Sequence, residues 1–196
     1  SVRLRSVSRI QSVISSLAIE GNTLAEAQGR DILDGKPVIG PKREIEEAGN
    51  ALKVYENCDS FDPFSLKDLL RAHGMMMKGL LSDAGHIRSG GVGVMAGKKV
   101  MHVAPPARMV RGLLEDLFGW VKSAPDHILV KSSVFHYEFE FIHPFSDGNG
   151  RMGRFWQMLL LTSWKPLFAQ LPVENIVRAH QRDYYDAIIK STHEND

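Results

Sequence analysis

The sequence predicts a mainly α-helical fold, a helical bundle with one small β-hairpin. Apolar residues recur every three or four positions through most of the 196-residue chain, which is the period of an amphipathic helix. Residues 85–104 break this pattern, because they are rich in glycine and contain short apolar alternations. A hydrophobic share of 43% is enough for a sizeable core. We therefore expect a single domain over residues 1–196.

The expected helices follow from apolar spacing and capping residues. The first has its apolar positions between Val7 and Leu17 and ends at Gly21. Ser65 is a good N-cap for a helix that runs to about Leu80, and its methionines at 75–77 are expected to fill gaps in the core. The remaining helices are expected at 24–33, 42–56, from just after Pro106 to about Val121, and at 126–142, 150–163 and 174–191.

A β-hairpin is expected at about residues 92–103. Two short β-like runs, 92–94 and 100–103, flank an Ala-Gly-Lys turn at 96–98. Two prolines then end the hairpin and precede a helix, a position in which proline is well tolerated.

The charge balance argues against a nucleic-acid-binding protein. Lys and Arg total 24 and Asp and Glu total 23, a formal net charge of +1, whereas nucleic-acid binders usually carry a broad basic surface. The single cysteine, Cys58, can form no internal disulfide and fits a reducing compartment. No apolar run is long enough to span a bilayer, and there is no signal-peptide pattern. We expect a cytoplasmic protein that binds neither nucleic acid nor membrane; a homo-oligomer stays open.

One segment is compatible with two secondary structures. Residues 135–141 alternate aromatic and polar side chains as in a strand, yet a helical stripe also runs through them. The choice matters because residues 148–153 match G-x-G-x-x-G, which after a strand would be the dinucleotide-binding fingerprint. We reject that interpretation, since no earlier strand–helix units precede it, too few residues follow it, and no second strand delivers Glu174, the acid at the fingerprint's distance. It stays a minor alternative.

The run from His143 to Arg154, His-Pro-Phe-Ser-Asp-Gly-Asn-Gly-Arg-Met-Gly-Arg, concentrates groups that suit a nucleotide triphosphate and its metal. Gly148 and Gly150 can take positive φ, which lets backbone amides converge on an anion at a helix N-terminus. Arg151 and Arg154 lie three residues apart on one helix face, and their planar guanidinium groups are good phosphate ligands.

Two further residues of this run suit acid–base and metal chemistry. Pro144 should end the preceding helix at His143, whose imidazole has an ordinary pKa suited to removing a proton from a hydroxyl. A carboxylate beside bound phosphates, such as that of Asp147, is a usual Mg²⁺ ligand. A hydrogen-bonded structural histidine and a helix N-cap are the alternatives, and the two arginines favour function. The combination fits transfer of a phosphorus-centred group from a nucleotide.

This run resembles the Fic motif, HPF-x-D/E-GNGR-x-x-R, and matches it at every specified position. The similarity extends to residues 85–88 and 102–106, which resemble the segments that flank the family's flap, and to the pair Tyr184-Tyr185. The resemblance implies a Fic-type helical core over residues 85–191 with a hairpin flap. It also implies a protein adenylyltransferase activity (AMPylation).

By that resemblance, each residue of the site has an expected role. His143 would deprotonate a Ser, Thr or Tyr hydroxyl on a target protein, which attacks the α-phosphate of ATP, and Asp147 would hold Mg²⁺. The residues expected to bind the nucleotide are Gly148, Asn149, Gly150, Arg151, Arg154 and, near the adenosine, Tyr185. The flap residues expected to dock the target by strand addition are Val100, Met101, His102 and Val103.

A second motif lies in residues 1–34, the N-terminal segment. Its run Ser-Leu-Ala-Ile-Glu-Gly-Asn, from Ser16 to Asn22, resembles the family's inhibitory motif, S/T-x-x-x-E-G/N. Glu20 paired with Arg154 would remove the γ-phosphate clamp and place a negative charge where the phosphate should lie. The resemblance therefore implies an auto-inhibited enzyme whose inhibitory residues are Ser16, Glu20, Gly21 and Asn22.

Two other functions stay open at this stage. Glu20 could orient a water molecule and reverse the modification, as a deAMPylase would. From a different class, a non-catalytic module could use the flap to hold a peptide, although the complete set of site residues argues against it.

Overall fold

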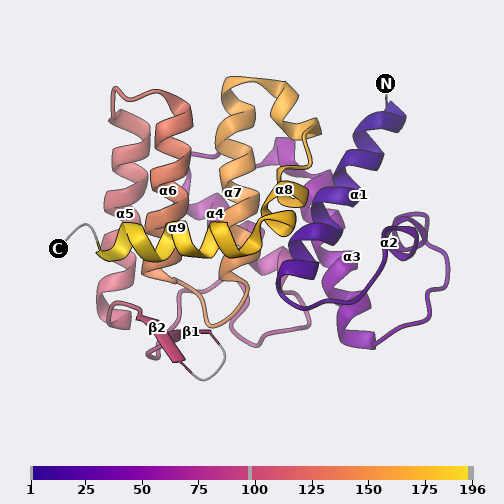
Figure 1. Cartoon of the computed structure of the whole chain (residues 1–196), viewed down its shortest axis with the longest axis horizontal. Helices are drawn as coiled ribbons and strands as arrows, with labels where there is room; N and C mark the ends of the chain where they lie inside the picture. Colours follow the sequence, from indigo (N-terminus) through magenta and orange to yellow (C-terminus); the bar gives the residue numbers. More distant parts are fainter. Residues whose placement is uncertain (1, 97–98, 194–196) are drawn as a thin grey trace.

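The computed structural model describes residues 2–96 and 99–193, with side chains for 7–93 and 103–191. The predicted mainly helical fold is confirmed (Figure 1). The elements, in chain order, are α1 (Val2–Ile19), α2 (Glu26–Leu33), α3 (Lys42–Glu56), a 3-10 turn η1 (Cys58–Ser60), α4 (Leu66–Met76), β1 (Gly93–Ala96), β2 (Lys99–Val103), α5 (Ala107–Ser123), α6 (Ile128–Ile142), α7 (Asn149–Trp164), η2 (Pro166–Gln170), α8 (Val173–Ala179) and α9 (Gln181–His193).

The helices α5, α6 and α7 stand side by side, with α5 at the left edge of the domain in the view of Figure 1. The N-terminal helix α1 packs against α3 and α8, so the first and last parts of the chain meet. The hairpin β1–β2 lies at the lower end of this group in the view of Figure 1, near the loop that joins α6 to α7. The segment that leads into the hairpin also contacts this loop directly, since the amide of Arg88 donates to the carbonyl of Pro144.

The ambiguous segment 135–141 is helical and belongs to α6. Phe135 and Phe139, four residues apart, are both fully buried and their rings stack with centroids 6.1 Å apart. Phe135 also meets Phe118 of α5 edge-on. The helical stripe prevails because it buries these rings together, and the dinucleotide-binding interpretation fails because a helix precedes the glycine-rich run.

The end of one helix was predicted wrongly. The helix from Ser65 ends at Met76 instead of about Leu80, because the chain turns after Met77 and Gly79 takes a positive φ of 74°. Ser65 itself caps α4 as expected, since its side chain accepts a hydrogen bond from the amide of Asp68.

The helix expected at residues 174–191 is split in two. His180 has φ −118° and ψ 36° and separates α8 from α9. On one side of the break, α8 packs on α1 and buries Glu174, whose carboxylate accepts a hydrogen bond from Tyr55 at 2.9 Å. On the other side, Tyr184 of α9 reaches His136 of α6. The break lets the segment make both contacts.

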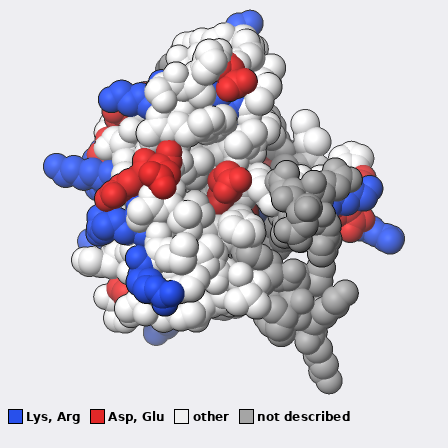
Figure 2. Space-filling view, turned by 90° about the vertical axis from the view of Figure 1, so that its left-hand side faces the viewer, with Lys and Arg blue, Asp and Glu red and all other residues white. Residues whose placement is uncertain are grey.

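None of the helices in the described ranges is both long and apolar enough to cross a membrane. Figure 2 shows the side of the molecule that carries α5, where acidic and basic side chains are interspersed among uncharged ones.

Candidate active site

The loop at residues 143–148 joins α6 to α7 and is anchored by a stack of two rings, one from the loop and one from α4. Phe145 is fully buried and stacks on His73 of α4, with ring centroids 3.6 Å apart. The Nδ1 of His73 accepts the amide of Gly85, so its Nε2 carries the proton and donates to the carbonyl of Asp147 at 3.0 Å. Burial lowers the pKa of His73 to about 4, which keeps the ring neutral. Sequence reasoning missed His73, because a lone histidine in a helix carries no signal of its own.

Asn149 closes the loop with its side chain. Its Oδ1 accepts the amide of Phe145 at 2.9 Å and its Nδ2 donates to the carbonyl of the same residue at 2.9 Å. Asn149 is buried, so this pair of hydrogen bonds replaces water on both polar atoms. The residue shapes the loop, and its role toward a nucleotide stays a prediction.

The two glycines of the loop are required for different reasons. Gly148 has a φ of 82°, and a Cβ there would lie 2.8 Å from the sulfur of Met77. The expectation of a positive φ at Gly150 is wrong, because this residue lies in the first turn of α7. A side chain at Gly150 would overlap the carboxylate of Glu20 and crowd Arg154. Glycine therefore permits the close approach of an anionic group to this helix N-terminus.

Arg154 is bound by the motif at the end of α1. Its Nη2 donates to Glu20 Oε1 at 2.6 Å and to the carbonyl of Ser16 at 3.1 Å, and its Nε donates to Ser16 Oγ at 3.0 Å. The side chain of Arg154 is 4% exposed and that of Glu20 is 38% exposed. Burial by itself lowers the pKa of Arg154, but the charge and hydrogen bond of Glu20, together with the neighbouring Tyr184 and Glu140, outweigh it and raise that pKa above its usual value. Gly21, at φ 92°, ends the helix as predicted.

Arg151 faces two carboxylates across longer distances. Its guanidinium lies 3.5 Å from Asp147 and 3.7 Å from Glu47 of α3, and its buried Nε has no hydrogen-bond partner among the described residues. Glu47 also accepts a 3.0 Å hydrogen bond from Asn22 of the N-terminal motif. A third arginine, Arg43, lies 3.4 Å from Asp147. Sequence reasoning missed Arg43 and Glu47, since nothing in the pattern of α3 distinguishes them from a solvated face.

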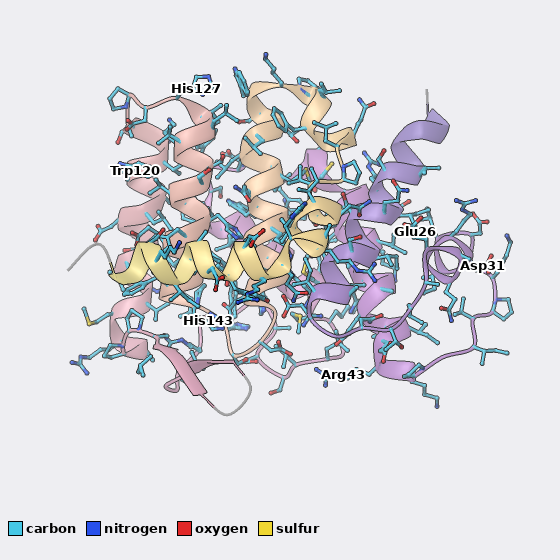
Figure 3. All side chains as sticks on the ribbon, viewed as in Figure 1. Glu26, Asp31, Arg43, Trp120, His127 and His143 are labelled. Atoms are coloured by element: carbon cyan, nitrogen blue, oxygen red, sulfur yellow. The ribbon has the colours of Figure 1, made fainter. Side chains whose placement is uncertain are left out.

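His143 lies where α6 ends, between the hairpin and α9 in the view of Figure 3. It has φ 49° and ψ 62°, the one positive φ of a non-glycine residue in the described part of the chain. Its amide donates to the carbonyl of Phe139 at 3.0 Å, and its Nδ1 lies 3.3 Å from the carbonyl of Glu140. The following Pro144 excludes a helical conformation here, so the predicted end of the helix at His143 is confirmed.

A buried polar cluster lies on the other side of Arg154. The Nε2 of His136 and the hydroxyl of Tyr184 are 2.6 Å apart. Burial raises the pKa of Glu140 to about 7 and lowers that of His136 to about 4. Next to this cluster, Tyr185 packs edge-on against Tyr184 and remains 42% exposed, which sets it apart from a core aromatic residue.

The flap is an antiparallel two-stranded sheet. Gly93 of β1 pairs with Val103 of β2, and the register shifts between Val94 and Met95. Among the predicted docking residues, Val103 is 74% exposed. The backbone of the other three lies in β2, but their side chains lie outside the described residues: Val100, Met101 and His102.

The carboxylate of Asp147 suits a metal ion that a bound substrate would also help to hold. In the described ranges, no group of three or more His, Cys, Asp or Glu side chains is arranged to hold a metal. The carboxylate of Asp147 is 46% exposed beside Arg151. Mg²⁺ is commonly bound by one or two carboxylates together with phosphate oxygens and water, so Asp147 fits that ion in the presence of a polyphosphate.

Fold and site together define a helical domain in which a glycine-containing loop leads into α7, two arginines of α7 lie near that loop, and a hairpin lies beside it. Residues 63–161, half of the chain, match the model of the Fic/DOC family. The chain belongs to the Fic/DOC family, and the predicted resemblance is confirmed.

The comparisons with individual proteins agree. A crystal structure of a Fic family protein from Desulfovibrio desulfuricans G20 superposes with a TM-score of 0.96 at 49% identity, covering 100% of this chain and 60% of that one. A Fic-1 structure from Caenorhabditis elegans gives a TM-score of 0.72 at 26% identity, covering 96% and 59%. "Protein adenylyltransferase Fic" of Culex quinquefasciatus is 31% identical over 90% of this chain. The chain spans 36% of the length of that relative.

Proposed function

We propose that this domain is a protein adenylyltransferase, which transfers AMP from ATP to a hydroxyl side chain of a target protein, and that Glu20 keeps it inactive. The observation that carries the proposal is the ion pair between Glu20 and Arg154 beside Gly150. A carboxylate lies where the loop and the helix N-terminus offer a place to an anion. The relatives named protein adenylyltransferase support the same activity.

In the proposed reaction, a hydroxyl oxygen of the target attacks the α-phosphorus of ATP. The new oxygen–phosphorus bond forms as the bond to the β-phosphate oxygen breaks, so pyrophosphate leaves with the electron pair. His143 takes the proton of the hydroxyl through its imidazole. Its backbone is held at the end of α6 by the contact to Phe139, so the base approaches from a fixed position.

The phosphates are proposed to bind at the first turn of α7. The amides of this turn have no acceptor within the helix, and the helix dipole favours negative charge there. Arg151 and Arg154 would hold the β- and γ-phosphates by charge-assisted hydrogen bonds. Mg²⁺ held by Asp147 would neutralise phosphate charge at a carboxylate that Arg43 also approaches, at 3.4 Å.

The inhibition follows from competition for one guanidinium group. Three donor contacts of Arg154 are used by Glu20 and Ser16, so the γ-phosphate would meet an occupied clamp and a like charge. An ATP molecule bound without that clamp has its α-phosphate out of line with the attacking hydroxyl. Removal of the Glu20 carboxylate frees Arg154 and restores the alignment.

The strand β2 is proposed to dock the target. Strand addition uses backbone hydrogen bonds, which tolerate varied target sequences. Val103 at the end of β2 is exposed and available for such a contact.

The test compares the wild type with Glu20→Gly, Glu20→Gln and the double variant Glu20→Gly/His143→Ala. Each is incubated with Mg²⁺, a panel of candidate proteins and ATP labelled at either the α- or the γ-phosphate. We expect α-label incorporation to rise about tenfold or more when Glu20 is replaced, because hydrogen bonds to charged groups contribute about 1.5–3 kcal/mol. The double variant should incorporate none.

Matched controls separate the outcomes. Glu26→Gln removes an exposed carboxylate of α2 and should change nothing. Incorporation of γ-label would replace AMP transfer with phosphoryl transfer. Loss of label from a premodified target that requires Glu20 would identify a deAMPylase, and the absence of both reactions together with peptide binding would favour the non-catalytic module.

A further inference from the structure

Arg88, in the segment between α4 and β1, is the most highly connected arginine outside the motif. It is 3% exposed, and its guanidinium donates four hydrogen bonds. The acceptors are four backbone carbonyls, of His143 at 2.7 Å, Gly90 at 2.7 Å, Pro105 at 2.6 Å and Ile142 at 3.2 Å. Its own amide donates to the carbonyl of Pro144 at 3.0 Å.

These acceptors come from two structural elements. Gly90 and Pro105 lie just before β1 and just after β2, so they mark the two ends of the hairpin. Ile142 and His143 are the last residue and the C-cap of α6. One guanidinium group therefore joins both ends of the hairpin to the peptide that carries the imidazole of His143.

The chemistry of the contact explains why an arginine is needed. The last carbonyls of a helix have no N–H donor within the helix, and they lie at the negative end of its dipole. A cation there is therefore stabilising. Burial lowers the pKa of Arg88, and the four carbonyls offset the loss of hydration. A lysine would supply the charge, but its compact ammonium group lacks the planar fork that reaches carbonyls on separate segments.

The contact also bears on the backbone of His143. A non-glycine residue in the left-handed region is disfavoured by about 1–2 kcal/mol, so this conformation has to be stabilised by its surroundings. The guanidinium of Arg88 donates to the carbonyls of Ile142 and His143, and the amide of Arg88 donates to the carbonyl of Pro144, so the backbone is held before, at and after His143.

We propose that Arg88 is a positioning residue that keeps the hairpin and His143 in register, so that a target strand added to β2 presents its hydroxyl to the imidazole. The proposal rests on the adenylyltransferase function proposed above. Its structural part, the coupling of the hairpin to the end of α6, is independent of the activity. Because of this coupling, the role proposed for Arg88 differs from that of a residue that only stabilises the fold.

The structural part is tested by hydrogen exchange on the full chain with Arg88→Lys and Arg88→Gln. The control is Arg108→Lys, which alters an exposed arginine of α5. We expect exchange to accelerate about tenfold in two separate regions, residues 90–105 and 142–145, because a hydrogen bond to a charged group is lost. Protection of α1, α3 and α7 should stay as in the wild type. Acceleration at only one of the two regions, or uniform acceleration over all helices, overturns the coupling.

The catalytic part is tested in the Glu20→Gly background. Arg88→Lys should lower kcat for transfer to the target about tenfold or more, while the Kd for Mg-ATP stays within about twofold. Guanidinium ion added to Arg88→Ala should restore part of the rate. A fall in kcat that only follows the loss of folded protein would make Arg88 a purely structural residue.

An inactive Glu20→Gly parent would reject the proposed function, and the exchange pattern would still decide the coupling. An active parent with an unchanged Arg88→Lys rate would reject the positioning role alone.

Discussion

Glu20 and Arg154 lie 134 residues apart in the sequence and form a 2.6 Å hydrogen-bonded ion pair at the first turn of α7. The pair joins the end of α1 to α7, the helix whose first turn is the proposed phosphate-binding position. Because Arg154 is buried and Glu20 is partly exposed, the carboxylate is the partner that can leave without exposing the core. The inhibitory interaction we propose is therefore reversible by a movement of the turn at the end of α1.

Ser16→Ala should relieve the inhibition in part. The hydroxyl of Ser16 accepts the Nε of Arg154 at 3.0 Å, and loss of a hydrogen bond to a charged group should raise the transfer rate about tenfold. The measurement is incorporation of α-label into a target. In the Glu20→Gly background the same substitution should add less than about twofold, because the interaction it weakens is already gone. Equal effects in both backgrounds would contradict this account.

Glu47→Gln should strengthen the binding of Mg-ATP. Its carboxylate lies 3.7 Å from Arg151 and holds Asn22 at 3.0 Å, so the substitution removes a negative charge near the proposed phosphate site. We expect the Kd to fall about two- to fivefold, the range for a weak ion pair, in a calorimetric titration. Glu46→Gln, at an exposed position of the same helix, is the control. An unchanged or weaker affinity for Glu47→Gln would exclude the role.

His73→Ala should destabilise the domain and loosen the loop. The substitution removes a ring stacked on Phe145 and two hydrogen bonds, to Gly85 and Asp147. We expect the free energy of unfolding to fall by about 2–4 kcal/mol, measured by urea denaturation. His86→Ala alters an exposed histidine in the same region and should cost little. Similar losses for the two variants would show that His73 does not support the loop.

Glu140→Gln should change how stability depends on pH. Burial raises the pKa of Glu140 from 4.5 to about 7, so the folded wild type binds an extra proton between these values and loses stability as the pH rises through them. The shift corresponds to about 3 kcal/mol. The contribution is fully present below about pH 4.5 and absent above about pH 7.

The measurement is the difference in unfolding free energy between Glu140→Gln and the wild type. It should move in favour of the variant by about 3 kcal/mol between pH 4.5 and 7.5. The charges of Arg154 and Glu20 act on Glu140 in opposite directions, and burial lowers the pKa of His136 to about 4, below this pH range. A difference that does not vary with pH would mean that Glu140 titrates normally.

Much of the fold could be predicted from local pattern. The bounds of α3 were predicted correctly at 42–56, and Ser65 caps α4, because amphipathic spacing and capping chemistry act within a few residues. The predicted helix over 174–191 failed at His180 because its break is set by contacts with α1 and α6, which no local pattern records.

The candidate site shows the same division. The run from His143 to Arg154 indicates its chemistry from the sequence alone, since its residue types and their spacing lie within one short segment. The partners of that run come from elsewhere: Arg88, His73 and Glu47 reach it from three other segments. His73 and Glu47 have no distinctive sequence context, and Arg88 is marked only by the resemblance of residues 85–88 to a segment beside the flap.

By itself, the sequence determined the helical class, the run from His143 to Arg154 with its histidine, aspartate and two arginines, and the resemblance of residues 16–22 to an inhibitory motif. The tertiary structure showed the contact between Glu20 and Arg154 that the motif resemblance implied. It alone decided that Gly150 is needed for this approach and that Arg88 joins the hairpin to His143. The physical reason is the distance along the sequence over which each interaction acts. Helix formation and loop chemistry depend on neighbours a few residues apart, whereas ion pairs and buried hydrogen bonds depend on which helices pack together.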